Sequence, residues 1–191
     1  MAKLIDAMGP SELKRRRGDA YAALVRSILY QQLAGPAAAA IHGRFLALFD
    51  GQGLSPEGVL ALGIDRLRTA GLSRSKATAI TDLSRRVADG ELVLTGLHRH
   101  SDEEIVRRLS TVWGIGEWTA HMFLMFQLGR LDVWPTGDYG VRKGYALAYG
   151  LPDLPTPRQL AELGEVFRPY RSLAALYCWR VVDGFAAPPG W

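Results

Sequence analysis

Helix-start signals recur along the whole of this 191-residue chain, and they constrain its fold more than any other feature. Ser55-Pro56-Glu57 combines an N-cap residue with a proline that suits the first helical turn. A second cap candidate, Ser73, precedes a helical pattern that continues to Gly90. Ser101–Glu104 and Thr156–Gln159 both match the capping box, in which two side chains satisfy free N–H groups at a helix start. These signals predict a chain built largely from short helices.

Apolar residues at helical spacing extend this prediction to the rest of the chain. They indicate helices from Tyr21 to Ala34, from Pro36 through Leu48, and from about Tyr170 to Gly184. The helix that begins at Ser101 is expected to end near Val112. The alternation typical of strands is missing, and Glu91–Leu94 is too short to indicate one. The sequence therefore predicts an all-α protein.

The composition is typical of a folded globular protein and excludes several classes of protein. Hydrophobic residues make up 48% of the chain and charged residues 22%, which is enough for one core or for two lobes that share one. The single cysteine, Cys178, excludes an intrachain disulfide, and it excludes a cysteine-held iron–sulfur cluster, which needs about four thiolates. No apolar run is long enough to cross a bilayer, and the N-terminus lacks the apolar core of a signal peptide. We therefore expect a cytoplasmic protein.

The net charge of +4 permits a polyanionic partner without requiring one. Basic residues form two clusters, one at Lys14–Arg17 and one between Arg66 and Arg86. Taken alone, each cluster is best interpreted as a solvated face.

A Gly-x-Gly turn, Gly114-Ile115-Gly116, connects two of the predicted helices. Glycine allows positive φ and lets a backbone approach a ligand closely. The second helix is expected to start directly after Gly116, so its unpaired N–H groups and the positive end of its dipole would point outward. Such a turn can bind a DNA phosphate regardless of base sequence. An ordinary glycine-terminated connection would give the same short pattern, so the turn needs a second signal.

The second signal is an aspartate, Asp138, which follows Gly116 by 22 positions. Leu109–Ala120 resembles the hairpin of the helix-hairpin-helix DNA glycosylase superfamily, and Gly137-Asp138-Tyr139 resembles its catalytic aspartate loop. Within that superfamily the chain is most similar to the 3-methyladenine DNA glycosylase II branch, from about Ser27 to Trp179. The resemblance implies excision of alkylated purines, of the 3-methyladenine and 7-methylguanine type, in base excision repair. It also includes the segments Ile28–Leu33 and Arg168–Ser172.

Three departures from the family pattern narrow this expectation. Bifunctional relatives place a lysine two residues after the second hairpin glycine to form a Schiff base with the opened sugar, and this chain has Trp118 there. We therefore expect a monofunctional enzyme without AP lyase activity. Trp113 replaces the usual hairpin proline, which bears on the rigidity of the turn. About twenty residues precede the first predicted helix, so the extra N-terminal α/β domain of larger bacterial members is expected to be absent.

The resemblance also assigns roles to individual residues. Asp138 would stabilise an oxocarbenium-like sugar or orient the attacking water, and it could at the same time cap the helix that starts near Tyr139. Trp118, Met122 and Trp179 would form the base pocket, because a flipped, often cationic, alkylated purine stacks well on indole rings. Packing in the core is the alternative for each tryptophan.

DNA-contacting residues follow from the same resemblance, and the partner would be double-stranded DNA containing alkylated bases. Gln32, with Leu33 beside it, falls where the family inserts a wedge into the gap that the flipped base leaves. A polar residue at a helix end that bonds to backbone is an equally good interpretation of Gln32. The hairpin contacts would come from Gly114, Ile115, Gly116 and Thr119.

No cofactor is expected to be required, because a positively charged alkylated base is already a good leaving group. Family members often hold a monovalent cation on hairpin carbonyls, which here would be those of Ser110, Val112 and Ile115. The four histidines are not spaced as a metal site. A monomer is the expected state of an enzyme that scans DNA.

The resemblance implies one glycosylase unit over residues 1–191, with two all-helical lobes bordering a DNA-binding cleft. Lobe one would comprise about residues 21–129, including the helix-hairpin-helix, and lobe two would comprise residues 1–20 and 130–191. Such a protein would be associated with the nucleoid. Two other functions stay open from the sequence: a non-catalytic DNA-binding module, and a glycosylase for a different lesion such as an oxidised guanine or a mismatched base.

Overall fold

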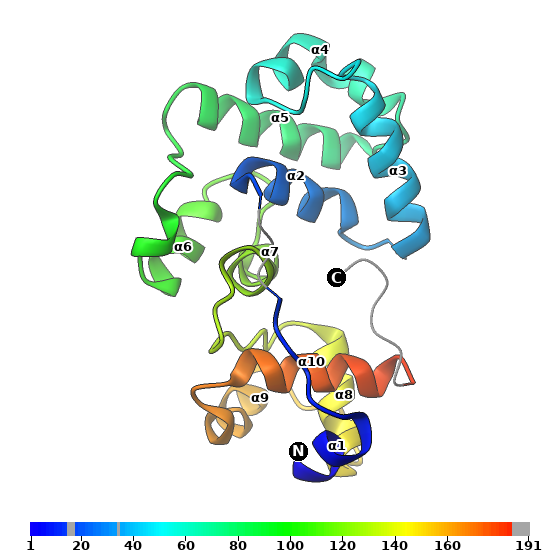
Figure 1. Ribbon diagram of the computed structural model, residues 1–191, viewed down its shortest axis with the longest axis vertical. Coiled ribbons are helices and arrows are strands. Elements are labelled where there is room, and N and C mark those ends of the chain that lie inside the picture. The colour runs from blue at the N-terminus through cyan, green and yellow to red at the C-terminus, as the bar shows by residue number, and fades with distance from the viewer. Residues whose placement is uncertain (15–17, 34, 185–191) are drawn as a thin grey trace. The chain divides into compact units, whose positions relative to one another are not determined.

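The computed structural model describes residues 1–14, 18–33 and 35–184, and every regular element in these ranges is helical (Figure 1). The absence of strands from these ranges confirms the all-α prediction. Among the described residues, no helix combines the length and the apolar character that crossing a membrane demands. The α-helices are α1 (Ala2–Met8), α2 (Ala20–Tyr30), α3 (Gly35–Ala47), α4 (Pro56–Arg68), α5 (Arg74–Ala88), α6 (Asp102–Leu109), α7 (Glu117–Met122), α8 (Tyr139–Tyr149), α9 (Pro157–Leu163) and α10 (Arg171–Val182). The other helical segments are the 3₁₀ turns η1 (Leu97–Arg99) and η3 (Glu165–Phe167) and the π-helix η2 (Phe123–Leu128).

Contacts within the chain divide it into two compact units. Unit 1 contains the described residues 1–14 and 124–184, and unit 2 contains residues 18–33 and 35–123. Unit 1 thus joins α1 to α8, α9 and α10, whereas unit 2 holds α2 to α7. The hairpin predicted around residues 114–116 lies in unit 2, and Asp138 and Trp179 lie in unit 1.

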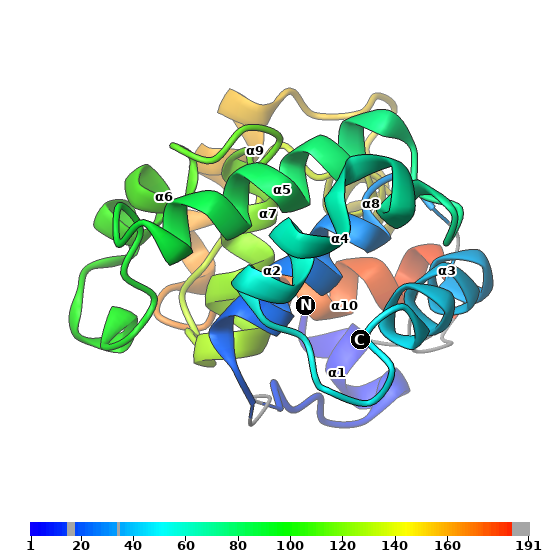
Figure 2. The same ribbon diagram turned by 90° about the horizontal axis from the view of Figure 1, so that it is seen from above.

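Unit 2 is built around α2, which packs against α3, α5 and α7. α4 runs beside α5 in both views of the chain (Figures 1 and 2). The Tyr21 hydroxyl and Ser84 Oγ lie 2.6 Å apart and link α2 to α5 by a hydrogen bond, and burial raises the pKa of Tyr21 to about 12. Apolar positions spaced by three or four residues form one face of a helix. On α2 the fully buried face consists of Leu24, Val25, Ile28 and Leu29.

Most of the predicted helix starts are confirmed. Ser55 caps α4 by accepting the Gly58 N–H at 3.0 Å, and Ser73 caps α5 in the same way. Thr156 and Gln159 form the complete capping box at the start of α9. These caps satisfy backbone donors that the first helical turn would otherwise leave unpaired.

The capping box predicted at Ser101 is only partly correct. Ser101 Oγ accepts the Glu104 N–H at 3.2 Å, as expected of an N-cap. The Glu104 carboxylate, however, binds Arg107 and Arg108, because both lie within one turn of it on α6. This helix ends at Leu109, three residues before the predicted end near Val112.

In unit 1, α8 and α10 pack against each other with very little space between their backbones. A Cβ added to Gly144 would lie 1.9 Å from the carbonyl oxygen of Cys178, so glycine is needed at this contact. Cys178 is fully buried, and burial raises the pKa of its thiol to about 12. This agrees with a small core residue and not with a nucleophile, whose thiol must ionise.

The N-terminal helix α1 was not predicted from the sequence. It has no side-chain cap and no buried residue, so it carries neither of the signals on which the prediction relied. The following segment is held by α10 instead. Tyr177 donates to the Gly9 carbonyl at 2.9 Å, and Arg180 donates to the Met8 carbonyl and to Ser11 Oγ.

Candidate functional site

The two glycines of the hairpin between α6 and α7 have different structural requirements. Gly114 has φ +81°, and a Cβ there would lie 2.9 Å from Ala79 Cβ, so both conformation and space require glycine. Gly116 caps α7 with φ −97° and ψ 179°, which any residue can adopt, and a Cβ there would meet no atom within 4 Å. The fold therefore accounts for Gly114 alone. A glycine at position 116 leaves the start of α7 open to a ligand from outside.

Asp82 of α5 braces the hairpin beside these glycines. Its Oδ2 accepts the Trp113 N–H at 2.9 Å, and the same carboxylate pairs with Arg85 and Arg86. Burial opposes ionisation here, but the Trp113 N–H and the two arginines outweigh it and lower the pKa of Asp82. These contacts support the turn where the sequence has tryptophan in place of the usual proline. They also occupy two of the arginines in the second basic cluster.

A glutamine that sequence reasoning missed joins the hairpin to the end of α2. Gln31 Nε2 donates to the Gly114 carbonyl at 3.0 Å and to Thr119 Oγ1 at 2.9 Å. Thr119 is only 2% exposed, and its hydroxyl accepts this hydrogen bond from within unit 2. No spacing rule could have paired residues 31 and 119, because the contact depends on how α2 packs against α7.

The predicted wedge residues lie directly after Gln31. α2 ends at Tyr30 and not at the predicted Ala34, because Gln31 leaves the helical conformation with φ −54° and ψ 130°, and Gln32 follows with φ +55°. Both Gln32 and Leu33 are exposed, Leu33 to 38%. A long polar and a large apolar side chain are thus presented together at the surface.

Asp138 lies at the start of α8, where it forms two hydrogen bonds through one oxygen. Its Oδ1 accepts the Val141 N–H at 2.7 Å, the contact expected of an N-cap, and the Trp179 Nε1–H at 2.8 Å. The structure thus brings together two of the predicted site residues. Gly140 makes the second bond possible, because a Cβ there would lie 2.7 Å from Trp179 Cδ1.

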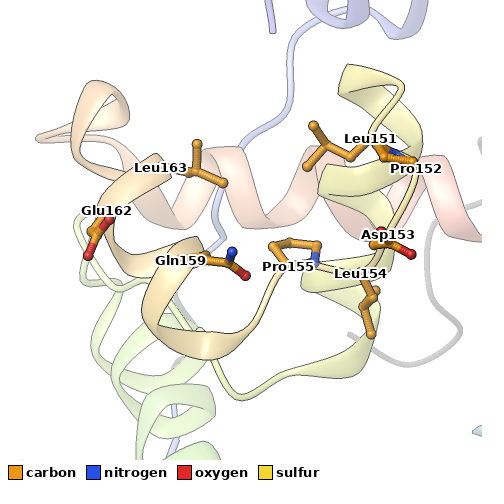
Figure 3. A pocket seen from close by; sticks show the side chains of 8 residues that line it. All are labelled: Leu151, Pro152, Asp153, Leu154, Pro155, Gln159, Glu162 and Leu163. Carbon is orange, nitrogen blue, oxygen red and sulfur yellow. The ribbon is translucent and has the colours of Figure 1, made fainter.

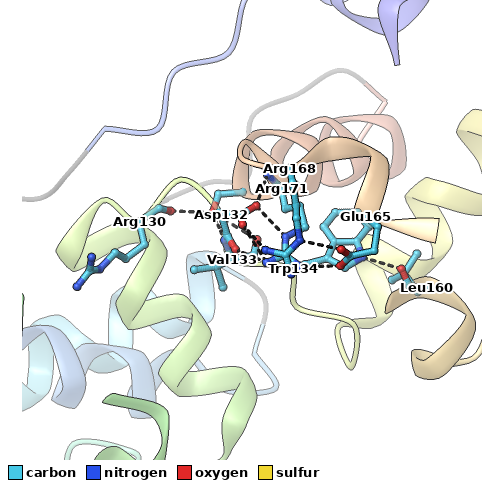
Figure 4. Close-up of polar contacts among 9 residues, drawn as sticks. Arg130, Asp132, Val133, Trp134, Leu160, Glu165, Arg168 and Arg171 are labelled. Atoms are coloured by element: carbon cyan, nitrogen blue, oxygen red, sulfur yellow. Dashed lines mark hydrogen bonds and ion pairs between the residues drawn. The ribbon is translucent and has the colours of Figure 1, made fainter. Parts of the chain in front are cut away.

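The loop that leads to Asp138 is fastened by the first turn of α10 (Figure 4). Ser172 Oγ donates to the Arg130 carbonyl at 2.7 Å and accepts the Val133 N–H at 2.9 Å. Arg171 forms a bidentate pair with Asp132, at 2.8 Å and 3.0 Å. Burial opposes the charge on Asp132, but the Arg171 guanidinium outweighs it and lowers the pKa of this carboxyl.

Trp134 ties the same loop to α9. Its side chain is 6% exposed, and its Nε1–H donates to the Leu160 carbonyl at 2.8 Å (Figure 4). α10 supports Asp138 in two ways. Its first turn holds the loop that precedes Asp138, and Trp179 near its end donates a hydrogen bond to the Asp138 carboxylate.

The three predicted pocket residues lie in two different units. Trp179, in unit 1, is partly exposed and stacks on Phe126, with ring centroids 6.1 Å apart and an interplanar angle of 28°. In unit 2, Trp118 is partly exposed, whereas Met122 is 2% exposed. Neither tryptophan is a fully buried core residue.

The backbone carbonyls expected to hold a monovalent cation belong to the turn between α6 and α7. The Val112 carbonyl accepts the Ile115 N–H at 3.1 Å, and a carbonyl oxygen with two lone pairs can take a second partner. Neutral carbonyl oxygens are the type of ligand that such a hard cation prefers. In the described part of the chain, no three His, Cys, Asp or Glu side chains are grouped as a metal site.

A hollow of about 470 Å³ opens on unit 1 between α9 and the loop that precedes it (Figure 3). Its lining is mostly aliphatic and proline side chains with two carboxylates, and it contains none of the predicted site residues. The residues around it are Leu151, Pro152, Asp153, Leu154, Pro155, Gln159, Glu162 and Leu163. Its lining has no aromatic ring on which a flipped base could stack.

The helical fold, the glycine hairpin and the fixed aspartate define a class of DNA repair protein. The chain matches the HhH-GPD superfamily of base excision DNA repair proteins over residues 25–169, and it belongs to that superfamily. This finding confirms the resemblance that the hairpin and the aspartate loop indicated.

Within this superfamily, the chain is similar to individual proteins that are named as 3-methyladenine DNA glycosylases. DNA-3-methyladenine glycosylase 1 of Schizosaccharomyces pombe is 33% identical over 183 residues, which cover 94% of this chain and 79% of that protein. A solved structure of 3-methyladenine DNA glycosylase from the same yeast, in complex with abasic DNA, superposes with a TM-score of 0.85 at 31% identity. That match covers 94% of this chain and 89% of the other. DNA-3-methyladenine glycosylase 2 of Escherichia coli is 28% identical over 84% of this chain and 57% of its own length.

Proposed function

We propose that this chain is a monofunctional DNA glycosylase that hydrolyses the N-glycosidic bond of alkylated purines, of the 3-methyladenine and 7-methylguanine type. The activity named for the similar proteins supports this substrate class. The observation that carries the proposal is the Asp138 carboxylate, whose Oδ1 is fixed by the Val141 and Trp179 N–H groups. Such an enzyme would act on chromosomal DNA in the cytoplasm, at the nucleoid.

In this mechanism Asp138 stabilises charge that develops on the sugar. The bond between C1′ and the base nitrogen breaks, and its electron pair leaves with the base, which thereby loses its positive charge. A water oxygen then bonds to C1′ and gives up a proton, which Asp138 accepts and passes to solvent. A carboxylate that is already held in place needs no reorganisation as the sugar becomes cationic, so its full stabilisation is present in the transition state.

The pocket would select the base by its charge. Trp179 and Trp118 offer electron-rich indole faces, on which a cationic purine stacks more strongly than a neutral one. Met122, which is 2% exposed, would contribute an adaptable apolar contact to the base. A cationic base also needs no general acid to leave, so we propose that the reaction requires no cofactor.

Binding would begin at the hairpin and would not depend on base sequence. The backbone around Gly114, Ile115 and Gly116 would hold a phosphate at the start of α7, where Gly116 leaves room for it. Gln32, with Leu33 beside it, would fill the space in the duplex that the flipped base vacates. A cation on the Ser110, Val112 and Ile115 carbonyls would supply local positive charge beside this phosphate. We propose that the protein acts as a monomer.

Base release from duplex DNA treated with a methylating agent tests the proposal. The comparison is between the wild type and Asp138→Asn, because asparagine keeps the Oδ1 acceptor for Val141 and Trp179 and removes only the charge. We expect the wild type to release methylated purines and the variant to lose at least about a hundredfold in rate while it keeps DNA affinity.

The outcomes separate the competing functions. Full activity in Asp138→Asn would overturn the role of this carboxylate. Binding of methylated duplex with no release by the wild type would favour a non-catalytic module. Release of 8-oxoguanine or of mismatched bases in place of methylated purines would change the substrate class and leave the glycosylase assignment intact.

A further inference from the structure

We propose that Gln31 is a positioning residue that locks the Gln32–Leu33 wedge to the phosphate-binding hairpin. The inference rests on the proposed function, because it concerns how the wedge acts when a base is flipped. It assigns a role to a residue that touches neither the sugar nor the reacting base. The consequence is that hairpin and wedge would engage DNA as one rigid element.

The contact joins two segments that are far apart in the chain. Gln31 Nε2 lies 3.0 Å from the Gly114 carbonyl oxygen and 2.9 Å from Thr119 Oγ1. The first acceptor belongs to the tip of the hairpin and the second to the first turn of α7. All three residues lie in unit 2, so one amide nitrogen spans the hairpin and holds it against the end of α2.

The chemistry of the contact calls for a primary amide. One nitrogen must donate two hydrogen bonds, one to a carbonyl and one to a hydroxyl, and the Gln NH₂ group does so without carrying charge. Glutamate at this position would bring an acceptor against the Gly114 carbonyl. Leucine would keep the approximate volume and remove both bonds.

A second anchor holds the end of α2 from the other side. Lys76 Nζ, on α5, donates to the Leu29 carbonyl at 2.6 Å, and burial lowers the pKa of this lysine. The chain is therefore fixed at residues 29 and 31, immediately before Gln32 with φ +55°. A non-glycine residue with positive φ is strained, and this strain persists only where the surrounding structure enforces it.

Rigidity at this point has a direct use for base flipping. The wedge must insert between the stacked bases while the hairpin holds the DNA backbone. Relative movement of the wedge and the hairpin would therefore make insertion less efficient. Gln32 and Leu33 are exposed, whereas Gln31 is partly buried and its Thr119 partner is 2% exposed, so the wedge side chains are more accessible to DNA than the anchor. Loss of the anchor should therefore impair wedge insertion more than phosphate binding.

The test uses the intact protein and a duplex that needs no excision. The duplex carries a tetrahydrofuran abasic-site analogue with 2-aminopurine opposite it, whose fluorescence rises when the wedge unstacks it. The variants are Gln31→Leu, Thr119→Val, Gln32→Ala and the double variant Gln31→Leu/Gln32→Ala. Gln52→Leu, in an exposed loop of unit 2, is the matched control.

We expect Gln31→Leu to lose most of the fluorescence rise and about tenfold in the single-turnover rate of methylpurine release, with affinity for undamaged duplex within about twofold. Thr119→Val should show a smaller loss, because one of the two bonds remains. In the Gln32→Ala background, Gln31→Leu should have a smaller further effect on either readout, because only the Leu33 part of the wedge is left to be positioned. Gln52→Leu should behave as the wild type.

Two results would overturn the inference. One is a Gln31→Leu protein with a wild-type fluorescence rise and release rate. The other is a Gln31→Leu effect of the same size with and without Gln32, which would indicate a general structural role. Failure of the proposed function would look different, because the wild type would then release no methylpurine while the fluorescence assay would still report on the Gln31 anchor.

Discussion

At the scale of single residues, the Asp138 carboxylate depends on a neighbouring glycine as much as on its two hydrogen-bond donors. A Cβ at Gly140 would stand 2.7 Å from Trp179 Cδ1 and 3.1 Å from Asp138 Oδ1. Gly140 lies within α8 and has no positive φ, so space and not conformation requires glycine there. The missing side chain is what lets the indole N–H reach Oδ1 at 2.8 Å.

Gly140→Ala should therefore impair catalysis by moving Trp179 away from Asp138. We expect the single-turnover rate of methylpurine release to fall at least about tenfold, because displacement of a positioned group by about 1 Å is enough for such a loss. Gly137→Ala is the matched control, since a Cβ at that position meets no atom within 4 Å. Equal rates for the two variants would show that the indole contact does not matter.

At the scale of elements, α8 and α10 act as one pair that carries the candidate catalytic residues. Gly140 and Gly144, one turn apart on α8, both face α10, the first towards Trp179 and the second towards the Cys178 backbone. α10 also begins with Arg171 and Ser172, which fasten the loop before Asp138. The position of Asp138 therefore follows from the packing of this pair.

Gly144→Ala should disrupt that pair more severely than any surface change. The new Cβ would lie 1.9 Å from a backbone oxygen, which no side-chain rotation can relieve, so we expect a loss of about 3 kcal/mol in the free energy of unfolding. Gly43→Ala on α3 is the control. Its Cβ meets nothing within 4 Å, and alanine in a helix interior should stabilise by about 0.5–1 kcal/mol. Urea denaturation measures both, and equal midpoints would contradict the close packing.

The Asp132–Arg171 pair predicts a pH dependence of stability. The pKa of Asp132 is lowered in the folded protein, so the folded state binds its proton less readily than the unfolded state. Its contribution is therefore complete above the ordinary aspartate pKa of about 3.9 and is lost as the pH falls through the lowered value. Asp132→Asn should cost roughly 2 kcal/mol near neutral pH and progressively less below about pH 4.

Asp65→Asn is the control for this dependence. The Asp65 side chain is 97% exposed and its ion pair with Arg68 is long, at 3.9 Å, so it should contribute little at any pH. Urea unfolding of both variants and the wild type between pH 3 and pH 7 measures the difference. A constant Asp132→Asn effect across this range would contradict the assigned linkage.

At the scale of the whole molecule, local signals predicted the helices well and predicted long-range contacts poorly. Caps such as Ser55 and Thr156 bind residues within one helical turn, so they can be predicted from the local sequence. The helix α1 lacks such a signal and was missed. The bond between Asp138 and Trp179 and the anchor at Gln31 depend on tertiary packing, which no residue spacing encodes. The family resemblance supplied the aspartate and the tryptophan, but not the glutamine.

The reaction of the whole enzyme should stop at an abasic site, because the position that carries a lysine in bifunctional relatives holds Trp118. A strand cut by β-elimination requires an amine that forms a Schiff base with the opened sugar, and an indole cannot form one. We expect methylated duplex to stay intact after incubation with the wild type and to break only after alkali. Borohydride should trap no covalent protein–DNA adduct under the same conditions. Strand breaks without alkali, together with a trapped adduct, would show that another amine of the chain serves as the nucleophile and that the enzyme is bifunctional.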